Sequence, residues 1–372
     1  MIRYRRSCRL LRAVLGLYML MCMISTTAFS ADTAATAPQP PPGGFGGAGT
    51  QPGREGGATP PGPPPDGEGD WTPPGPPPGG FQGGGAVDHG TYAALVDKDA
   101  AGADYSSAGD KENAVRVEGS TVVLSGITIN KTSGAAGTGD ASNFYGCNAG
   151  LLAMGKADVT INGANVSTSA PGANGIFSYG AGTKVTLNNV TIRTTNNSSG
   201  GIMVAGGGAM YVSDCDIETQ GGSSAALRSD RGGGTLAVTG GTHISHGPGS
   251  PAVYCTARVS ANNATLTATS SEAIVIEGKN GGQCVFTADR QEIVGNTIVD
   301  KISTLGFSLT SGSTLRGTIN NANSGGSVTV HVDETSRWTL TADAYVTSLT
   351  GTTENIIPNG FTVYVNGIAA IK

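Results

Sequence analysis

Short segments in which apolar and polar residues alternate recur along most of the chain, in pairs separated by a tight polar turn. Two examples are Val159–Ile161 with Ala164–Val166, and Val185–Leu187 with Val190–Ile192. Alternation of this kind is typical of strands that have one face on a core and the other in water. Each pair therefore predicts two consecutive β-strands that meet at a sharp corner.

The strand pairs repeat at a nearly constant interval. Successive units are 26, 25, 26 and 23 residues long, measured between Ile161, Leu187, Val212, Val238 and Ala261. A small residue followed by apolar ones precedes each pair, as in Gly175-Ile176-Phe177, so each unit has three strands. Units this short leave no room for crossover helices, and each strand must pair in parallel with its counterpart in the next unit. The sequence therefore predicts an all-β fold, a right-handed parallel β-helix.

The turn inside each strand pair is rich in Asn and Gly, which tolerate a left-handed backbone better than other residues do. A sharp corner needs such a backbone conformation, so we interpret these residues as structural and not as ligand-binding. They are Asn162-Gly163, Asn188-Asn189, Gly240-Gly241 and Asn262-Asn263.

Four segments follow from these patterns. Residues 1–30 predict a signal peptide, because arginines precede a short apolar run and Ala28-Phe29-Ser30 offers a cleavage site. Residues 31–87 are dominated by Pro and Gly and predict a disordered linker. Residues 88–285 predict the coils of the β-helix, and residues 286–372 predict less regular β coils with a cap.

Two shorter stretches are expected to differ from the regular coils. Thr91 to Gly119 is the candidate for an amino-terminal cap, because an open parallel stack presents unpaired strand edges. Lys131 to Gly146 is an insertion that carries Phe144 and Tyr145. Its aromatic residues predict either a protruding binding loop or local packing onto the helix.

The mature chain is acidic. Removing the leader takes away five arginines and no acidic residue, which changes the formal net charge from −5 to −10. This balance argues against nucleic acid as a partner, because binding phosphates requires clustered Lys and Arg. The leader predicts a secreted protein in the extracellular space, at the cell surface or in the periplasm, with no stable transmembrane segment in its mature form.

Four cysteines remain after removal of the leader: Cys147, Cys215, Cys255 and Cys284. Their even number allows two disulfides in an oxidising compartment, but free thiols stacked in the core fit equally well. No CxxC pair indicates a zinc site.

The repeated pattern resembles the pectin-lyase-like family of right-handed β-helices, and within it secreted adhesin-like and carbohydrate-binding proteins of bacteria. The resemblance implies glycan binding or adhesion. The calcium-binding Asp cluster with an Arg-x-Pro-x-x-Arg setting of pectate lyases is missing, as are the Asp-Asp and Gly-His-Gly signatures of polygalacturonases. The stretches that carry the resemblance are Ser142–Gly146, Ala173–Gly180, Arg228–Gly234 and Val275–Asn280.

Charged and aromatic residues follow equivalent strands in neighbouring coils and predict one stripe along a single face. Tyr rings in such a stripe would stack on sugars, and Arg or Asp would hydrogen-bond their hydroxyls or carboxylates. The alternative is that Arg228 and Asp230 form an internal salt bridge at a tight turn. The predicted ligand-binding residues are Tyr179, Arg228, Asp230, Arg231, Tyr254, Glu277 and Lys279.

Two further groups of residues invite a functional interpretation. Asp214, Asp216 and Glu218 can supply oxygen ligands to calcium, although a solvated acidic edge explains them better. His243 and His246 have no neighbouring nucleophile or zinc-ligand pattern, so we expect both to be outward-facing surface residues.

The residues thus favour a secreted, non-enzymatic protein that binds a polysaccharide or cell-surface glycan or mediates adhesion. No catalytic residue and no cofactor are predicted, with calcium left as a possible ligand. The first alternative is a calcium-dependent lyase that acts on acidic polysaccharides, and the second is a structural surface spacer.

Overall fold

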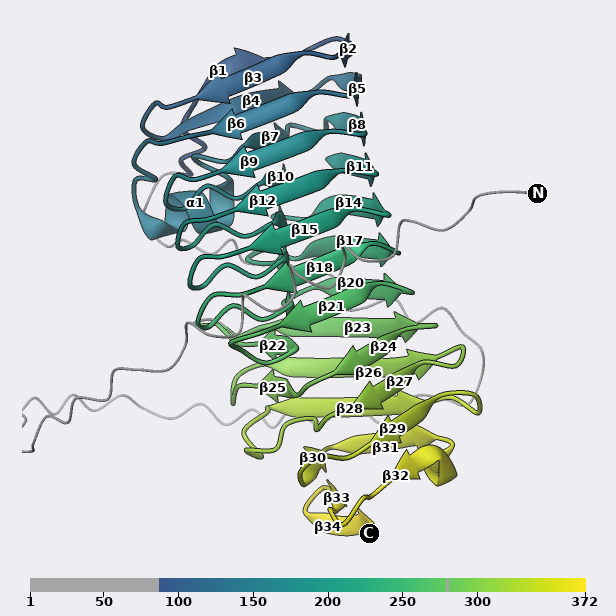
Figure 1. The fold of residues 1–372 in the computed structure, drawn as a ribbon. Helices are drawn as coiled ribbons and strands as arrows, with labels where there is room; N and C mark the ends of the chain where they lie inside the picture. The colour runs from purple at the N-terminus through teal and green to yellow at the C-terminus, as the bar shows by residue number, and fades with distance from the viewer. Residues whose placement is uncertain (1–86, 279–280) are drawn as a thin grey trace, which may run out of the picture. The chain divides into compact units, whose positions relative to one another are not determined.

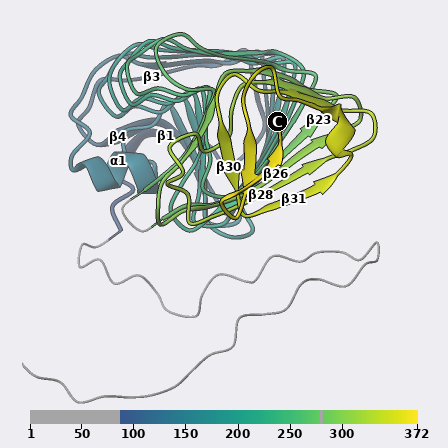
Figure 2. The ribbon, with the colours of Figure 1, turned by 90° about the horizontal axis from the view of Figure 1, so that it is seen from below.

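The computed structural model describes residues 87–278 and 281–372, which form a right-handed parallel β-helix (Figure 1). Each regular coil contributes one strand to each of three sheets, here named A, B and C in the order in which the chain enters them. Figure 2 shows the coils from the end of the stack. The predicted leader and the predicted linker, apart from Val87, lie outside the described residues.

Sheets A and B are parallel throughout. The nine strands of sheet A are β1 (Thr91–Leu95), β4 (Glu112–Glu118), β7 (Leu151–Met154), β10 (Ile176–Tyr179), β13 (Ile202–Ala205), β16 (Leu227–Ser229), β19 (Val253–Tyr254), β22 (Ile274–Ile276) and β25 (Thr297–Val299). The eleven strands of sheet B are β2 (Ala100–Ala101), β5 (Thr121–Ser125), β8 (Asp158–Asn162), β11 (Lys184–Asn188), β14 (Gly208–Ser213), β17 (Gly234–Thr239), β20 (Arg258–Asn262), β23 (Gln283–Asp289), β26 (Thr304–Thr310), β28 (Ser327–Val332) and β31 (Ser348–Gly351).

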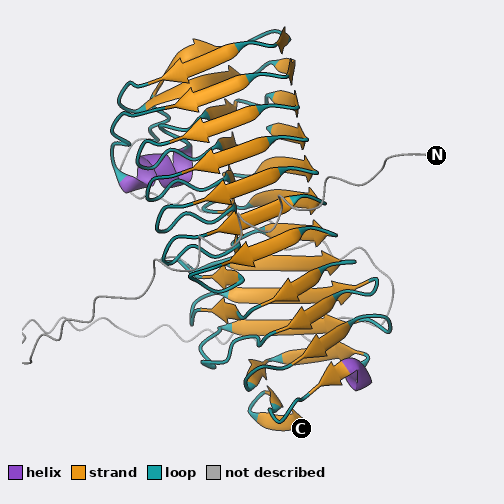
Figure 3. Ribbon diagram, in the orientation of Figure 1, coloured by secondary structure: helices purple, strands orange, loops and turns teal. Residues whose placement is uncertain are grey.

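Sheet C is also parallel and ends earlier than the other two. Its seven strands are β3 (Asp104–Ser107), β6 (Thr128–Lys131), β9 (Asn165–Thr168), β12 (Thr191–Thr194), β15 (Asp216–Thr219), β18 (Thr242–Ser245) and β21 (Thr265–Ala268). Among the described residues, the helices are α1 (Gly139–Tyr145) and the short 3-10 helix η1 (Thr353–Asn355) (Figure 3).

The register between coils confirms the predicted repeat. Ile161 of β8 pairs with Leu187, and the same row continues through Val212 and Val238 to Ala261. All five side chains are at most 2% exposed, so the row is a column of stacked aliphatic side chains inside the solenoid. Burying such side chains is the main favourable contribution to folding.

The corner between sheets B and C has the left-handed backbone that its Asn and Gly residues predict. The φ angles are 66° at Gly163, 54° at Asn189, 63° at Gly240 and 48° at Asn263. Asp214 occupies the same corner in its own coil, with a φ of 51°. The predicted left-handed backbone at these turns is therefore confirmed.

The prediction that His243 lies on the surface is wrong. In β18 the register places His243 beside Ile217 and Leu266, and its side chain is fully buried. The Nε2 atom lies 3.2 Å from the Gly240 carbonyl oxygen, while Nδ1 has no partner. Burial lowers the pKa of His243 from 6.5 to about 4. Alternation in Thr-His-Ile suggested that the isoleucine was the core residue, but Ile244 takes the outward position instead.

The two ends of the stack are built differently from each other. Thr91 to Gly119 does not form a separate cap, because β1, β2 and β3 make the first coil and β4 begins the second. At the other end, sheet C is followed by two small sheets. Sheet D contains β24 (Glu292–Val294), β27 (Thr314–Arg316), β29 (Arg337–Thr339) and β32 (Ile356–Ile357), and sheet E contains β30 (Ala344–Val346), β33 (Val363–Val365) and β34 (Ile368–Ile371).

The predicted segment boundary at residues 285 and 286 falls inside β23, which belongs to a continuous sheet B. The real change in architecture is the replacement of sheet C by sheet D. The last pair of strands, β33 and β34, is antiparallel. An antiparallel hairpin ends the parallel ladder because the chain turns back on itself.

The cysteines divide into one bridge and two thiols. Cys255 and Cys284 form a disulfide across 29 residues, from the end of β19 to the start of β23. Cys147 and Cys215 are free and buried. Burial raises the pKa of the Cys147 thiol to about 11, so this thiol stays protonated at neutral pH and is a poor nucleophile.

Substituting Asn189 tests the left-handed corner. Asn189→Val should lower the free energy of unfolding by about 1–2 kcal/mol, because a β-branched side chain clashes with the backbone at positive φ. Asn189→Gly should cost little. Urea denaturation of both variants measures the difference, and equal stability of the two would contradict the argument.

The buried His243 should make stability depend on pH. Its folded pKa is lower than its unfolded pKa, so the unfolded state binds the proton first as the pH falls. The stability present above pH 6.5 should therefore decrease between pH 6.5 and about 4, by up to about 3 kcal/mol. His243→Leu should remove this part of the pH dependence in thermal denaturation curves. A variant with the same pH profile as the wild type would contradict the assignment.

Candidate functional groove

The outer face of sheet A divides into a covered part and an open part. One row of outward side chains runs in register through Arg116, Leu152, Phe177 and Met203 and then continues along the open part. Leu152, Phe177 and Met203 are fully buried although they point away from the core of the solenoid. The insertion with α1 lies on the outer side of sheet A (Figure 2). Its Gly146 packs so closely on this row that an added Cβ would lie only 2.6 Å from Leu152 Cδ1 and 3.1 Å from the Phe177 ring.

The open part of the same row forms the floor of a groove of about 500 Å³. Four coils in register provide the floor: Arg228 of β16, Tyr254 of β19, Val275 of β22 and Ile298 of β25. The rim comes mainly from loops that join sheet C to sheet A, with one contribution from α1 at the end of the groove. These lining residues are Asn143, Ser198, Ser223, Ala225, Gly249, Pro251, Ser271, Glu272 and Glu277.

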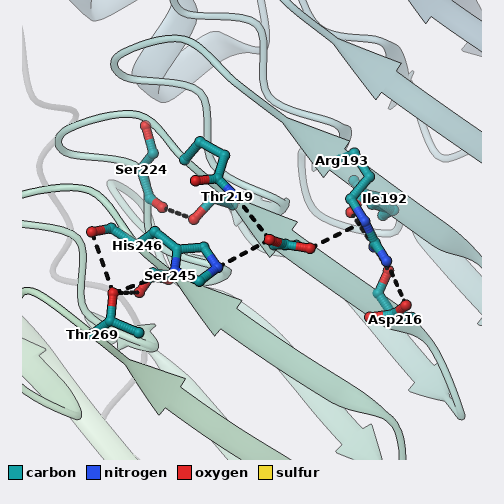
Figure 4. A network of polar contacts seen from close by, with 10 residues as sticks. Ile192, Arg193, Asp216, Thr219, Ser224, Ser245, His246 and Thr269 are labelled. Atoms are coloured by element: carbon teal, nitrogen blue, oxygen red, sulfur yellow. Dashed lines mark hydrogen bonds and ion pairs between the residues drawn. The ribbon is translucent and has the colours of Figure 1, made fainter. Parts of the chain in front are cut away.

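Buried hydroxyl groups hold the rim loops in place. Thr194 at the end of β12 donates a hydrogen bond of 2.5 Å to the carbonyl of Ser199, and Thr219 does the same to Ser224 one coil later (Figure 4). The loops are also bonded to one another, because the Ser199 amide donates to the Ser224 hydroxyl at 2.9 Å. The rim is thus ordered before any ligand arrives, which lowers the entropic cost of binding.

Arg228 is held by two neighbours at one end of the groove. Its Nη2 and Nε atoms donate to Asp230 Oδ2 at 2.6 Å and 3.0 Å, and its guanidinium lies 5.1 Å from the centre of the Tyr254 ring. The two charged side chains are 12% and 10% exposed. This is the internal salt bridge that was the alternative to a binding role.

Tyr254 is fixed at both ends of its side chain. Its hydroxyl donates to the Glu277 carbonyl oxygen at 2.5 Å, and its ring lies under Arg228. Burial is the main cause that raises the pKa of Tyr254, so the hydroxyl stays protonated at physiological pH. The ring is half-buried and lines the groove.

The structure brings together only part of the predicted stripe. Arg228, Tyr254 and Glu277 line the groove, and Asp230 is bonded to Arg228 beside it. Tyr179 lies elsewhere, with its ring 4.6 Å from that of His89 in an aromatic cluster. Lys279 lies outside the described residues.

Arg231 and the aromatic residues of the insertion pack locally. The Arg231 guanidinium lies 3.8 Å from the centre of the Phe144 ring and 3.5 Å from Asp140. The Tyr145 ring is 6.0 Å from the Tyr179 ring. Of the two interpretations of the insertion, these contacts fit local packing onto the solenoid.

The acidic residues weighed as calcium ligands lie outside the groove, on and beside the outer face of sheet C. Asp216 forms an ion pair with Arg193 at 2.5 Å, and Glu218 lies 3.3 Å from the same arginine and 3.0 Å from His246 (Figure 4). His246 is partly exposed, as expected. In the described part of the chain, no three His, Cys, Asp or Glu residues are placed to hold a metal ion.

The sequence interpretation missed the rim of the groove. Ser198, Ser223 and Gly249 lie 25 and 26 residues apart, so they occupy the same position in three successive coils. Each has a left-handed backbone, with φ angles of 56°, 53° and 64°. The constant spacing of these three residues could have indicated the rim. Polar loop residues, however, do not stand out in a search for hydrophobic periodicity.

Comparison with known proteins gives no match: no protein-family model, no curated protein and no solved structure matches this chain. The structure itself shows a parallel β-solenoid. Among residues 87–278 and 281–372, no helix is long and apolar enough to cross a membrane.

Breaking the Arg228–Asp230 pair should be costly, because it leaves one nearly buried charge without its partner. Arg228→Met should lower the free energy of unfolding by about 3 kcal/mol. The double variant Arg228→Met with Asp230→Asn should be more stable than the single one, since it removes both charges. Denaturant titrations measure both differences.

The exposed Arg193–Asp216 pair provides the control. Arg193→Met should cost less than about 1 kcal/mol, because exposed ion pairs contribute little. If Arg228→Met costs no more than Arg193→Met, the Arg228–Asp230 pair has no special structural role.

Proposed function

We propose that this protein is a secreted, non-enzymatic module that binds a polysaccharide chain along the groove over sheet A. The observation that carries the proposal is the open row of Arg228, Tyr254, Val275 and Ile298 beneath an ordered rim. Neighbouring coils are ~4.8 Å apart, so the floor extends over roughly 14 Å. This length suits several sugar residues of an extended chain.

The chemistry of the lining supports a carbohydrate. Tyr254 offers an aromatic ring of the kind that stacks on the apolar face of a sugar ring. Val275 and Ile298 add apolar surface on the same floor, and Ser198, Ser223 and Ser271 add hydroxyl groups at the rim. A mixture of apolar surface with a few polar groups is what a ligand site needs for affinity and orientation.

The location of the protein is part of the proposal. The predicted leader at residues 1–30 would export the chain, and the Pro/Gly-rich segment that follows would separate the solenoid from a surface or a partner. A glycan-binding solenoid in that setting would act in adhesion. We further propose that the protein belongs to an adhesin-like group within the pectin-lyase-like family.

The test is retention of the mature protein on soluble polysaccharides in affinity electrophoresis. Tyr254→Ala should weaken binding roughly tenfold, which corresponds to about 1.4 kcal/mol. Tyr211→Ala is the matched control, because Tyr211 is an exposed tyrosine on sheet B, away from the groove. Circular dichroism should be the same for both variants.

Equal retention of the two variants would contradict binding in the groove. Ultraviolet absorbance of unsaturated products is followed in the same samples, with and without calcium. Product formation would replace the binding module with a polysaccharide lyase.

A further inference from the structure

The charges that line the groove affect which class of polysaccharide it can bind. Three lining residues are charged: Arg228, Glu272 and Glu277. Arg228 is neutralised by Asp230 at 2.6 Å. Neither Glu272 nor Glu277 forms an ion pair with another residue in the described part of the chain. Among the residues that the structure describes, the lining therefore carries an excess of negative charge.

The only arginine in the lining already has its charge balanced by an acidic neighbour. Recognition of a carboxylate by arginine uses two parallel N–H groups of the guanidinium. In Arg228 the Nε and Nη2 groups already donate to Asp230, and the Tyr254 ring packs against the guanidinium. A uronic acid that approached the Nη1 side would meet a guanidinium whose charge Asp230 already balances, so the net attraction is small.

The remaining polar groups of the rim are neutral. Ser198, Ser223 and Ser271 line the groove, and all three are at least partly exposed. A hydroxyl group can donate and accept, as the hydroxyls of a sugar do. Ser198 and Ser223 lie one coil apart, so they offer the same contact twice along the groove.

We propose that the groove selects uncharged polysaccharides and excludes polyuronates, an inference that rests on the proposed function. A polyuronate places a negative charge on every sugar, and these charges would lie within the ~8 Å screening length of Glu272 and Glu277. A neutral glycan meets no such repulsion, and its hydroxyl groups match the serine rim.

The experiment compares a panel of soluble neutral α- and β-glucans with polygalacturonate, using the full mature protein in affinity electrophoresis. At least one neutral glucan should be retained, at least tenfold more tightly than polygalacturonate. Its binding should change little between low and physiological salt, because no charge is involved. The double variant Glu272→Gln with Glu277→Gln should gain affinity for polygalacturonate at low salt and keep its affinity for the neutral glucan.

The matched control is Glu334→Gln with Glu354→Gln, which changes the net charge by the same amount at two exposed positions outside the groove lining. This variant should behave as the wild type. If it gains polygalacturonate binding equally, the overall charge of the protein explains the selectivity and the inference is overturned.

The remaining outcomes separate the inference from the proposed function. Retention of polygalacturonate as tight as that of any neutral glucan, abolished by Tyr254→Ala, would overturn the charge selectivity but leave the groove as a glycan site. No retention of any polysaccharide by the wild-type protein would overturn both.

Discussion

Parallel pairing between successive coils is the constraint on which the rest of this structure depends. Each backbone N–H and C=O group in a regular strand is satisfied by the coil above or below, at a spacing of ~4.8 Å. A given position in one coil therefore has an equivalent in the next, and side chains form rows along the stack. The aliphatic core, the left-handed corners and the buried serines that hold the rim loops are all such rows.

Because of the same parallel pairing, one row of side chains runs through both the covered part and the open part of the outer face of sheet A. One outward row begins as a site for packing, where Leu152, Phe177 and Met203 lie beneath the insertion, and becomes a groove floor at Arg228. The parallel pairing of the strands continues from one part to the other. The difference comes from the insertion, which covers some coils and leaves the others open. A loop in one coil therefore decides which residues of other coils can meet a ligand.

Much of the fold could be predicted from the sequence because its determinants are local and periodic. The strand pairs, the unit lengths from Ile161 to Ala261 and the left-handed corners follow from alternation and from Asn and Gly. His243 could not be assigned in this way, because Thr-His-Ile alternates equally well in either sense. The pairing of Cys255 with Cys284 depends on which side chains meet inside the core, and spacing alone does not determine this.

The candidate site was predictable only in part, for the same reason. The repeat length aligns Arg228 with Tyr254 in the neighbouring coil, and both line the groove together with Glu277. The position of the insertion was not determined by any period, and so the packing of Arg231 and Tyr179 with aromatic residues was missed. The rim serines were missed because their conformation depends on buried hydroxyls of the preceding strand.

The insertion between β6 and β7 also indicates where the sequence of such a protein can change in length during evolution. Leu124 and Ile161 are 37 residues apart, yet they pair in register as closely as residues separated by an ordinary coil. The corner between sheets C and A therefore absorbs extra length without disturbing the stack. Insertions and deletions at this corner can remodel the surface that a ligand meets, while the inherited rows of the core stay intact. A mutation that adds or removes one residue within a strand does disturb the stack, because every side chain that follows in that strand moves to the opposite face of the sheet.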